Sequence, residues 1–334
     1  MGEALEIAKV LVSPTVKLMD MVGGALGTLY EPRHKRKMID ATVYEINSIG
    51  EVMRKYADLP VVYNQDGVAI TSEDFNRLMQ RAGTRLVLQE TVKQHNIESV
   101  VDNAYEILEK EEVCSEEPVE QGWINRFFDS VADISDEDLQ NLWGKVLAGE
   151  IKQPKSYSLR TLETLKNLSK HEASLFQKIA PFVLREGNNH FIVSNNDILK
   201  KHDLNYHEIL QLDECGLINS GISVSLQISL SNTEESQIFN KCKMIVLKGL
   251  SSSVTKVSVG GYGITRAGIE ILSLIDFIPD DSIVEDVFDL IVKKSPSNLK
   301  MAIHKVNSIQ ENSINYDLNI LREFQEQSPK KMID

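Results

Sequence analysis

The fold class is decided by residues 123–175, WINRFFDSVADISDEDLQNLWGKVLAGEIKQPKSYSLRTLETLKNLSKHEASL, in which helix signals follow one another without a break. Ser135 is placed to cap a helix with three carboxylates in its first turn. Apolar residues then recur at helical spacing until Gly149, which we expect to end the helix. A leucine-rich helix follows, and the capping box Ser169–Glu172 begins a third. The stretch predicts a helical module whose structural core includes Trp123, Trp143, Leu147, Leu162 and Leu165.

Three motifs of this region carry a resemblance to known families: WINRFFD, LQNLWGKVLAGE and SLRTLETLKNLS. Together they resemble the central core of an uncharacterised bacterial family, a domain of unknown function, and this resemblance extends over most of the chain. A looser resemblance is carried by the tryptophan-bearing helix, its small-residue end and the LKNLS turn, which are similar to the abortive-infection alpha family of phage-defence proteins. The resemblances imply a cellular setting in bacterial defence. Neither brings a residue with a catalytic or binding role.

The composition is that of a folded protein long enough for two domains, with 334 residues, 42% of them hydrophobic and 25% charged. Cys114, Cys215 and Cys242 are scattered without metal-ligand spacing, which favours a reducing compartment. The chain shows neither a secretory signal pattern nor a run of about 20 apolar residues. The sequence therefore predicts a cytoplasmic protein that does not span a membrane, with a peripheral place on the inner membrane as the alternative.

The net charge of −13 is unevenly distributed. Residues 109–138 hold eleven acidic side chains and only two basic ones, which disfavours contact with nucleic acid. One interpretation is a solvated linker and helix start. The other is an electrostatic partner for a basic surface, including one on this same chain.

The N-terminal segment 1–37 combines an amphipathic helix with a basic cluster. One hypothesis lays this helix on an anionic membrane, with its apolar face down and the cations at the headgroups. The alternative packs the helix on the protein's own core or on a second copy. The residues predicted for this membrane or partner surface are Leu18, Met19, Val22, Leu26, Arg33, Lys35, Arg36 and Lys37.

A helical period also runs through residues 37–57 and, after a Pro60–Gly67 break, from Glu73 to about Glu112. The second run predicts either one helix of some forty residues or two helices broken near His95 and Asn96. So long a helix needs a partner surface, so we expect an antiparallel hairpin with the preceding helix or a dimer seam.

From residue 173 onward, short helices alternate with apolar strands, and the segment YGITRAGIEIL at 262–272 resembles the entry to the last helix of winged helix-turn-helix domains. The candidate recognition helix, residues 205–214, holds three acids and no Arg or Lys, which argues against DNA binding. A protein-docking or architectural winged helix is the favoured interpretation. In the tail we expect a helix at 282–293, an amphipathic segment at 299–309 and a further helix at 318–324.

Catalytic and metal-binding readings find no support in the sequence. The glycines at 260–263 lack the spacing of a phosphate-binding loop, and His202 and His207 are five residues apart, so they do not share a helix face. Asp129, Asp133 and Asp136 lack the remaining ligands of a calcium loop. We therefore predict no catalytic residue, no metal and no cofactor.

The sequence as a whole predicts a mainly α protein with a smaller α+β part. Its predicted domains are an N-terminal segment 1–37, a helical domain 38–168, a winged-helix-like domain 169–278 and a helical C-terminal extension 279–334. The predicted function is that of a non-enzymatic interaction protein in anti-phage defence, with a protein partner or self-association expected and an anionic membrane surface as a further partner. The alternative is a winged-helix regulator that binds nucleic acid, a partner that the charge distribution disfavours.

Overall fold

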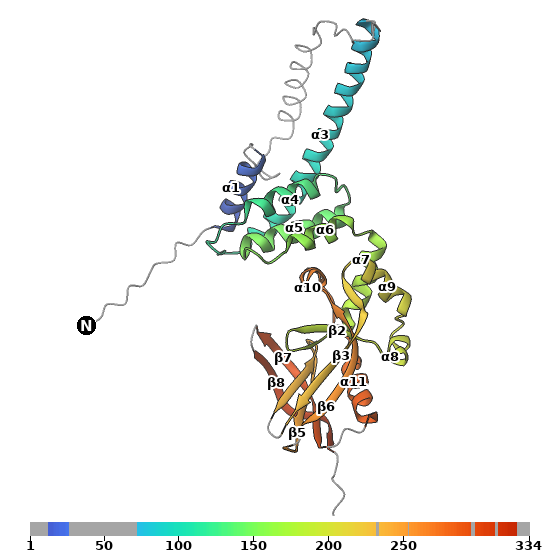
Figure 1. Cartoon of the computed structure of the whole chain (residues 1–334). Helices are drawn as coiled ribbons and strands as arrows, with labels where there is room; N and C mark the ends of the chain where they lie inside the picture. Colours follow the sequence, from blue (N-terminus) through green and yellow to red (C-terminus); the bar gives the residue numbers. More distant parts are fainter. Residues whose placement is uncertain are drawn as a thin grey trace, which may run out of the picture. The chain divides into compact units, whose positions relative to one another are not determined.

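The computed structural model describes residues 13–26, 72–231, 234–252, 254–294, 298–310 and 313–325 (Figure 1). The chain divides into two compact units, Met1–Leu162 and Glu163–Asp334. The first unit is helical, and the second combines short helices with one antiparallel sheet.

The described helices of the first unit are α1 (Pro14–Leu26), α3 (Ser72–Leu108), α4 (Gln121–Val131) and α5 (Glu137–Lys152), and α6 (Leu159–Asn167) crosses the boundary between the units. α3 is one continuous helix of 37 residues, so the alternative of a break near His95 and Asn96 is wrong. Asn96 is buried instead, and its side-chain amide donates to the Ala132 carbonyl at 2.8 Å. A polar side chain with such a partner interrupts the apolar stripe without breaking the helix.

The ends of α5 differ from the expectation in two details. Its cap is Asp136 rather than Ser135, with the Asp136 carboxylate accepting from the Leu139 amide at 3.2 Å. The helix also continues through Gly149 to Lys152. A β-carbon at Gly149 would lie 2.7 Å from the Tyr157 ring, so this glycine serves close packing rather than helix termination. The capping box at Ser169 and Glu172 is confirmed.

The second unit contains a series of short helices and an eight-stranded sheet. The helices are α7 (Lys170–Ile179), the 3₁₀ turn η2 (Ala180–Phe182), α8 (Asn196–Lys201), α9 (Tyr206–Glu214), α10 (Arg266–Leu272) and α11 (Ser282–Lys293). The strands are β1 (Leu184–Glu186), β2 (Asn189–Val193), β3 (Ile218–Leu230), β4 (Glu235–Phe239), β5 (Lys243–Gly249), β6 (Thr255–Ile264), β7 (Leu299–Gln310) and β8 (Ser313–Gln325).

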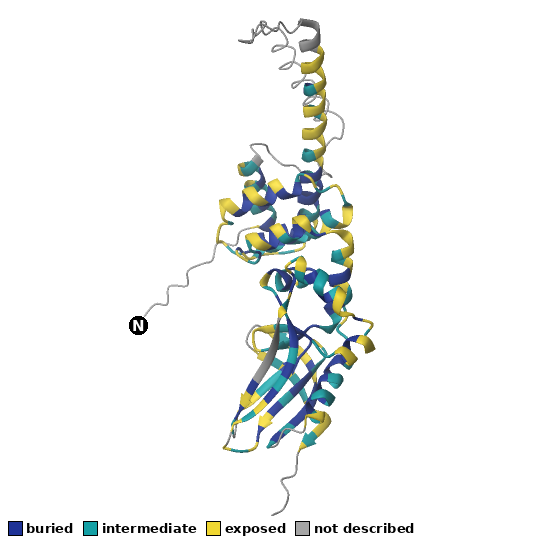
Figure 2. Ribbon diagram, turned by 45° about the vertical axis from the view of Figure 1, so that its right-hand side comes forward, coloured by how far each residue is buried: buried dark blue, intermediate teal, exposed yellow. Residues whose placement is uncertain are grey.

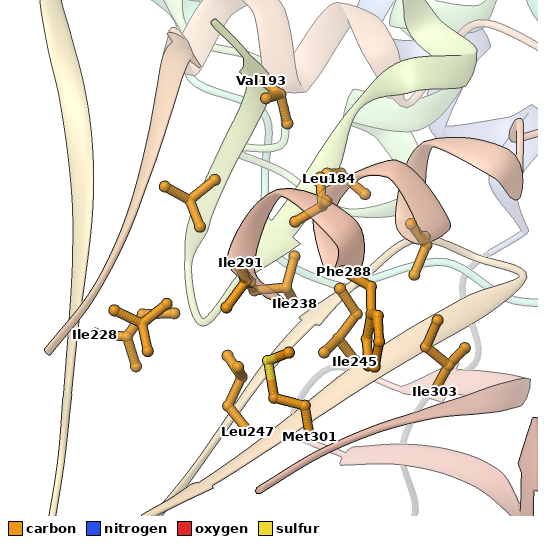
Figure 3. Close-up of a cluster of buried hydrophobic side chains, with 14 of the residues drawn as sticks. Leu184, Val193, Ile228, Ile238, Ile245, Leu247, Phe288, Ile291, Met301 and Ile303 are labelled. Atoms are coloured by element: carbon orange, nitrogen blue, oxygen red, sulfur yellow. The ribbon is translucent and has the colours of Figure 1, made fainter. Parts of the chain in front are cut away.

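The strands pair antiparallel throughout, in the order β3-β6-β2-β1-β4-β5-β7-β8. α11 lies against one face of this sheet, and its side chains Val287, Phe288 and Ile291 join those of the strands in one buried cluster (Figure 3). The sequence predicted a helix at 282–293, and the structure confirms it. This layer of helix on sheet forms the core of the second unit.

The fold-class prediction is wrong: the protein is an α+β fold with an extended antiparallel sheet, not a mainly α protein with a winged-helix-like domain. β1, β4, β7 and β8 were not expected, and the predicted helical extension at 279–334 contains the long hairpin of β7 and β8 after α11. Leu299 and Ile303 are four residues apart, a spacing that fits a helix face and also one face of a strand. Pairing with β5, where Leu247 lies opposite Met301, selects the strand.

Candidate interaction surface on the long helix α3

The C-terminal half of α3 is held firmly by α5. Gln140 lies beside Asn96, with 3.4 Å between the two side-chain amides, and a β-carbon at Gly144 would lie 2.6 Å from that of Asn103. Further along, the Lys152 ammonium contacts the Glu111 carboxylate at 2.7 Å. α5 therefore runs beside α3 in the same direction and fixes its axis.

The N-terminal half of α3 extends beyond α4 and α5, and its side chains are largely exposed (Figure 2). Leu88 is 62% exposed and Val92 is 55% exposed, far more than the interior of a helical unit allows. The exposed large apolar side chains of this half are Leu78, Met79, Leu86, Leu88 and Val92. We call the half from Arg77 to Val92 the arm.

Five exposed residues of the arm fall at alternating spacings of three and four, which places them on one side of a helix. They are Leu78, Arg81, Arg85, Leu88 and Val92, and we call them the arm face. Arg81 and Arg85 make no ion pair with another described residue. An open depression lined partly by Arg81, Arg85 and Leu88 follows this side of the helix. The arm face is thus apolar and basic at once.

The acidic side chains after α3 lie at the other end of the same helix. Residues 109–120 form the connection to α4, and in it Glu109, Glu112, Glu116 and Glu120 are exposed. Val113 is also exposed among them. We call residues 109–120 the acidic segment. Its middle is anchored, since the Ser115 amide donates to the Lys152 carbonyl at 2.9 Å.

α1 is docked on the helical unit. Leu18 and Val22 are buried, and the helix contacts α3, α4 and α5. The Lys17 ammonium donates to the carbonyls of Ser115 at 2.8 Å, Glu117 at 2.7 Å and Ile151 at 3.1 Å. Three carbonyl acceptors hold this cation against the protein rather than leaving it to a headgroup.

The other residues predicted for that surface are only partly described. Met19 is half-buried in α1, whereas the side chain of Leu26 lies outside the described residues. Arg33, Lys35, Arg36 and Lys37 also lie outside them. The structure therefore places Leu18 and Val22 in the interior and leaves the basic cluster untested.

The residues predicted for the structural core are all buried: Trp123, Trp143, Leu147, Leu162 and Leu165. The Trp123 indole donates to the Tyr157 carbonyl at 2.8 Å and stacks on Phe127 at 5.1 Å. Phe127 in turn meets Trp143 edge to face at 5.5 Å. This row of aromatic side chains joins α4 to α5, the helix that packs against α3.

In the second unit, the charged side chains of α11 are matched from other elements. Lys201 and His202 at the end of α8 contact Asp286 at 2.5 and 2.7 Å. Lys243 of β5 contacts Glu285 at 2.9 Å, and Arg322 of β8 contacts Asp289 at 2.5 Å. The hydrogen bond with Asp289 is the main cause that raises the pKa of Arg322. These contacts fasten α11 to the end of α8 and to the strands β5 and β8.

The imidazole of His190, unlike the charged side chains around α11, has a pKa that favours its neutral form. His190 on β2 lies opposite Arg185 on β1. Burial lowers the pKa of His190 to about 4, and the charge of Arg185 adds to that shift. His190 Nδ1 and Arg185 Nε are buried, and neither atom has a hydrogen-bond partner among the described residues. Burial removes water from the imidazole and the nearby Arg185 repels a second positive charge, so the protonated form is destabilised.

Two of the three acids on α9, the candidate recognition helix, have partners within the protein. The Glu208 carboxylate completes a capping box with Asn205 and also pairs with Lys178 at 2.9 Å. Asp213 accepts a hydrogen bond from the Ser220 hydroxyl. Over the part of the chain that the structure describes, no three His, Cys, Asp or Glu side chains gather in a metal-binding arrangement, and no helix there is long and apolar enough to cross a membrane.

The sequence predicted a partner surface along this helix, either an antiparallel hairpin or a dimer seam, but did not identify the arm face as its site. The sequence showed Leu78, Met79, Leu86 and Val92 as part of a long apolar stripe, and we expected them to be covered. The signal that could have identified the surface is the spacing of Arg77, Arg81 and Arg85, each four residues apart on a helix that otherwise carries apolar side chains.

Comparison with known proteins identifies a family. The model of the family described as protein of unknown function DUF2806 matches residues 80–287. These residues begin within the arm and run through the helical unit into α11 of the second unit. No curated protein and no solved structure matches the chain.

Proposed function

The chain belongs to the DUF2806 family, and we propose that it is a non-enzymatic interaction protein that binds a protein partner through the arm face. The observation that carries this proposal is the exposure of Leu88 and Val92 beside Arg81 and Arg85, which pair with no other described residue, on a helix whose other half is fixed by α5. Exposed apolar side chains gathered on one helix face are typical of helix recognition by a partner.

The rigidity of α3 supports a role in presenting this surface. Binding to such an arm loses little conformational entropy, because the packing at Gly144 and Gln140 already sets the direction of the helix. Arginine suits such a face, since its aliphatic stem packs on apolar side chains while the guanidinium selects an acidic partner. The setting in phage defence is carried over from the resemblance of the middle third of the chain to the abortive-infection alpha family.

The experiment is site-specific photocrosslinking from the arm in living cells. A crosslinking residue in place of Leu88 should give a discrete covalent product, whereas the same residue in place of exposed Leu159 on α6 should not. Equal labelling from both positions would remove the arm face from the proposal. The defence setting is tested separately, by the plating efficiency of phages on cells with and without the protein, and equal plating for a broad phage panel would contradict it.

A further inference from the structure

We propose that the partner of the arm face is the acidic segment of a second copy of this chain, so that two molecules associate with their α3 helices antiparallel. This inference rests on the proposed function, because it names the occupant of the same surface. It is carried by two complementary surfaces, one on the arm of α3 and one just beyond the other end of that helix, that cannot reach each other within a single molecule.

The charges of the two surfaces are complementary. The arm face presents Arg81 and Arg85 one helical turn apart, and the acidic segment presents Glu112 and Glu116 with exposed Val113 between them. Neither the two arginines nor these two glutamates pair with a described residue of their own molecule. Contact between the surfaces would give each charge an opposite neighbour and would cover Val113 with Leu88 and Leu78.

The distance along α3 prevents this contact within one molecule. Arg85 and the end of α3 at Leu108 are separated by about 35 Å at the rise of an α-helix. The acidic segment does not fold back toward the arm, since it is anchored to Lys152 by its backbone and to Lys17 by two carbonyls. The two surfaces therefore meet only between molecules.

A two-fold axis satisfies both contacts at once. The separation between arm face and acidic segment is the same in each copy, so an antiparallel arrangement that seats one arm on its partner's acidic segment also seats the other. Pairing of the two arms with each other is disfavoured, because an antiparallel seam centred on Arg85 would bring two guanidinium groups face to face. The charges select the register, and Leu78, Leu88 and Val92 supply most of the affinity, since exposed ion pairs contribute little.

The test is a charge exchange in the full-length chain, followed by sedimentation velocity across micromolar concentrations. We expect the wild type to dimerise, with an affinity that falls as salt rises. Arg81→Glu with Arg85→Glu, or separately Glu112→Lys with Glu116→Lys, should weaken dimerisation at least about tenfold through like-charge contact. Arg160→Glu with Lys166→Glu reverses two exposed cations of α6 and should leave dimerisation unchanged.

The decisive sample is the mixture of the two exchanged variants. A heterodimer joins a glutamate arm to a lysine segment and an arginine arm to a glutamate segment, so mixing should restore dimerisation that each variant lacks alone. A monomeric wild type, or a mixture that stays monomeric, overturns the inference. If the wild type is monomeric while Leu88 still crosslinks to another protein, the proposed function stands and only the identity of the partner is wrong; if Leu88 crosslinks to nothing, both fail.

Discussion

α11 and the arm of α3 are both charged amphipathic helices, yet the protein surrounds them differently. In α11, Glu285, Asp286 and Asp289 each meet a lysine or arginine from another element, and the apolar side is buried on the sheet. In the arm, Arg81 and Arg85 find no described partner and the neighbouring Leu88 is exposed. A helix whose charges and apolar face are both paired within the protein belongs to the core of the fold. The arm has neither paired among the described residues, and this difference supports our proposal that it binds a partner.

Truncating the buried side of α11 should have the largest effect. Phe288 is 1% exposed and its ring lies beneath the Arg322 guanidinium at 4.7 Å. Phe288→Ala should lower the free energy of unfolding by about 3–5 kcal/mol, through the lost burial and the cavity left behind. Chemical denaturation measures it, and Leu88→Ala in the arm is the matched control, with an expected change within about 0.5 kcal/mol. Equal losses from both variants would show that the arm is as much a part of the core as α11.

Disturbing the contact that fixes α3 should have the next largest effect. The β-carbon of Gly144→Ala would clash with the Asn103 side chain and with the backbone of Ala104. Both residues are in α3, so the clash can be relieved only by moving the helix. Such overpacking costs about 1–3 kcal/mol. Thermal unfolding measures this loss, and Gly122→Ala at the exposed start of α4, where the nearest atom is a flexible Glu120 oxygen at 3.5 Å, is the control. A Gly144→Ala protein as stable as the wild type would mean that α5 does not set the position of α3.

A pH titration probes His190, whose pKa is lowered mainly by burial and further by the charge of Arg185. The pKa of His190 is about 4 in the folded protein, below the value near 6.5 expected in the unfolded chain. The unfolded chain therefore takes up the proton first as the solution is acidified, so stability is complete above about pH 6.5 and falls between pH 6.5 and 4. With allowance for partial exposure, we expect a loss of roughly 1–2 kcal/mol.

His190→Gln tests the assignment of this acid loss. The variant cannot titrate in this range, so its free energy of unfolding, measured by urea denaturation at several pH values, should change less than that of the wild type between pH 6.5 and 4.5. His171→Gln is the control, since it replaces an exposed histidine at the start of α7. Parallel pH profiles for the wild type and His190→Gln would contradict the burial of a neutral imidazole.

The sequence was a good guide where local signals agreed with the environment. The capping box at Ser169, the amphipathic run of α11 and the tryptophan-bearing helix α5 all lie as predicted, apart from its ends. It failed for β7 and β8, because Leu299, Ile303 and Val306 fit a helix face as well as a strand and only the long-range pairing with β5 decides between them. The arm face was not identified for a similar reason. An apolar stripe shows that a helix is amphipathic, but it does not show whether the surface that covers the stripe belongs to the same molecule or to another.

The smallest effect on stability is expected at the arm face itself. A change there should affect binding without affecting folding, which is the opposite of what we expect for α11. Leu88→Ser with Val92→Ser replaces two exposed apolar side chains, so the free energy of unfolding should change by no more than about 0.5–1 kcal/mol, largely through helix propensity. The same variant should lose the self-association that the arm supports, because the apolar contacts supply most of the affinity. Circular dichroism and a melting curve establish that the fold is intact before sedimentation is measured. If the double variant unfolds instead, the arm is already covered within its own molecule, and the distinction between α11 and the arm disappears; if it is stable and associates like the wild type, binding does not pass through this face.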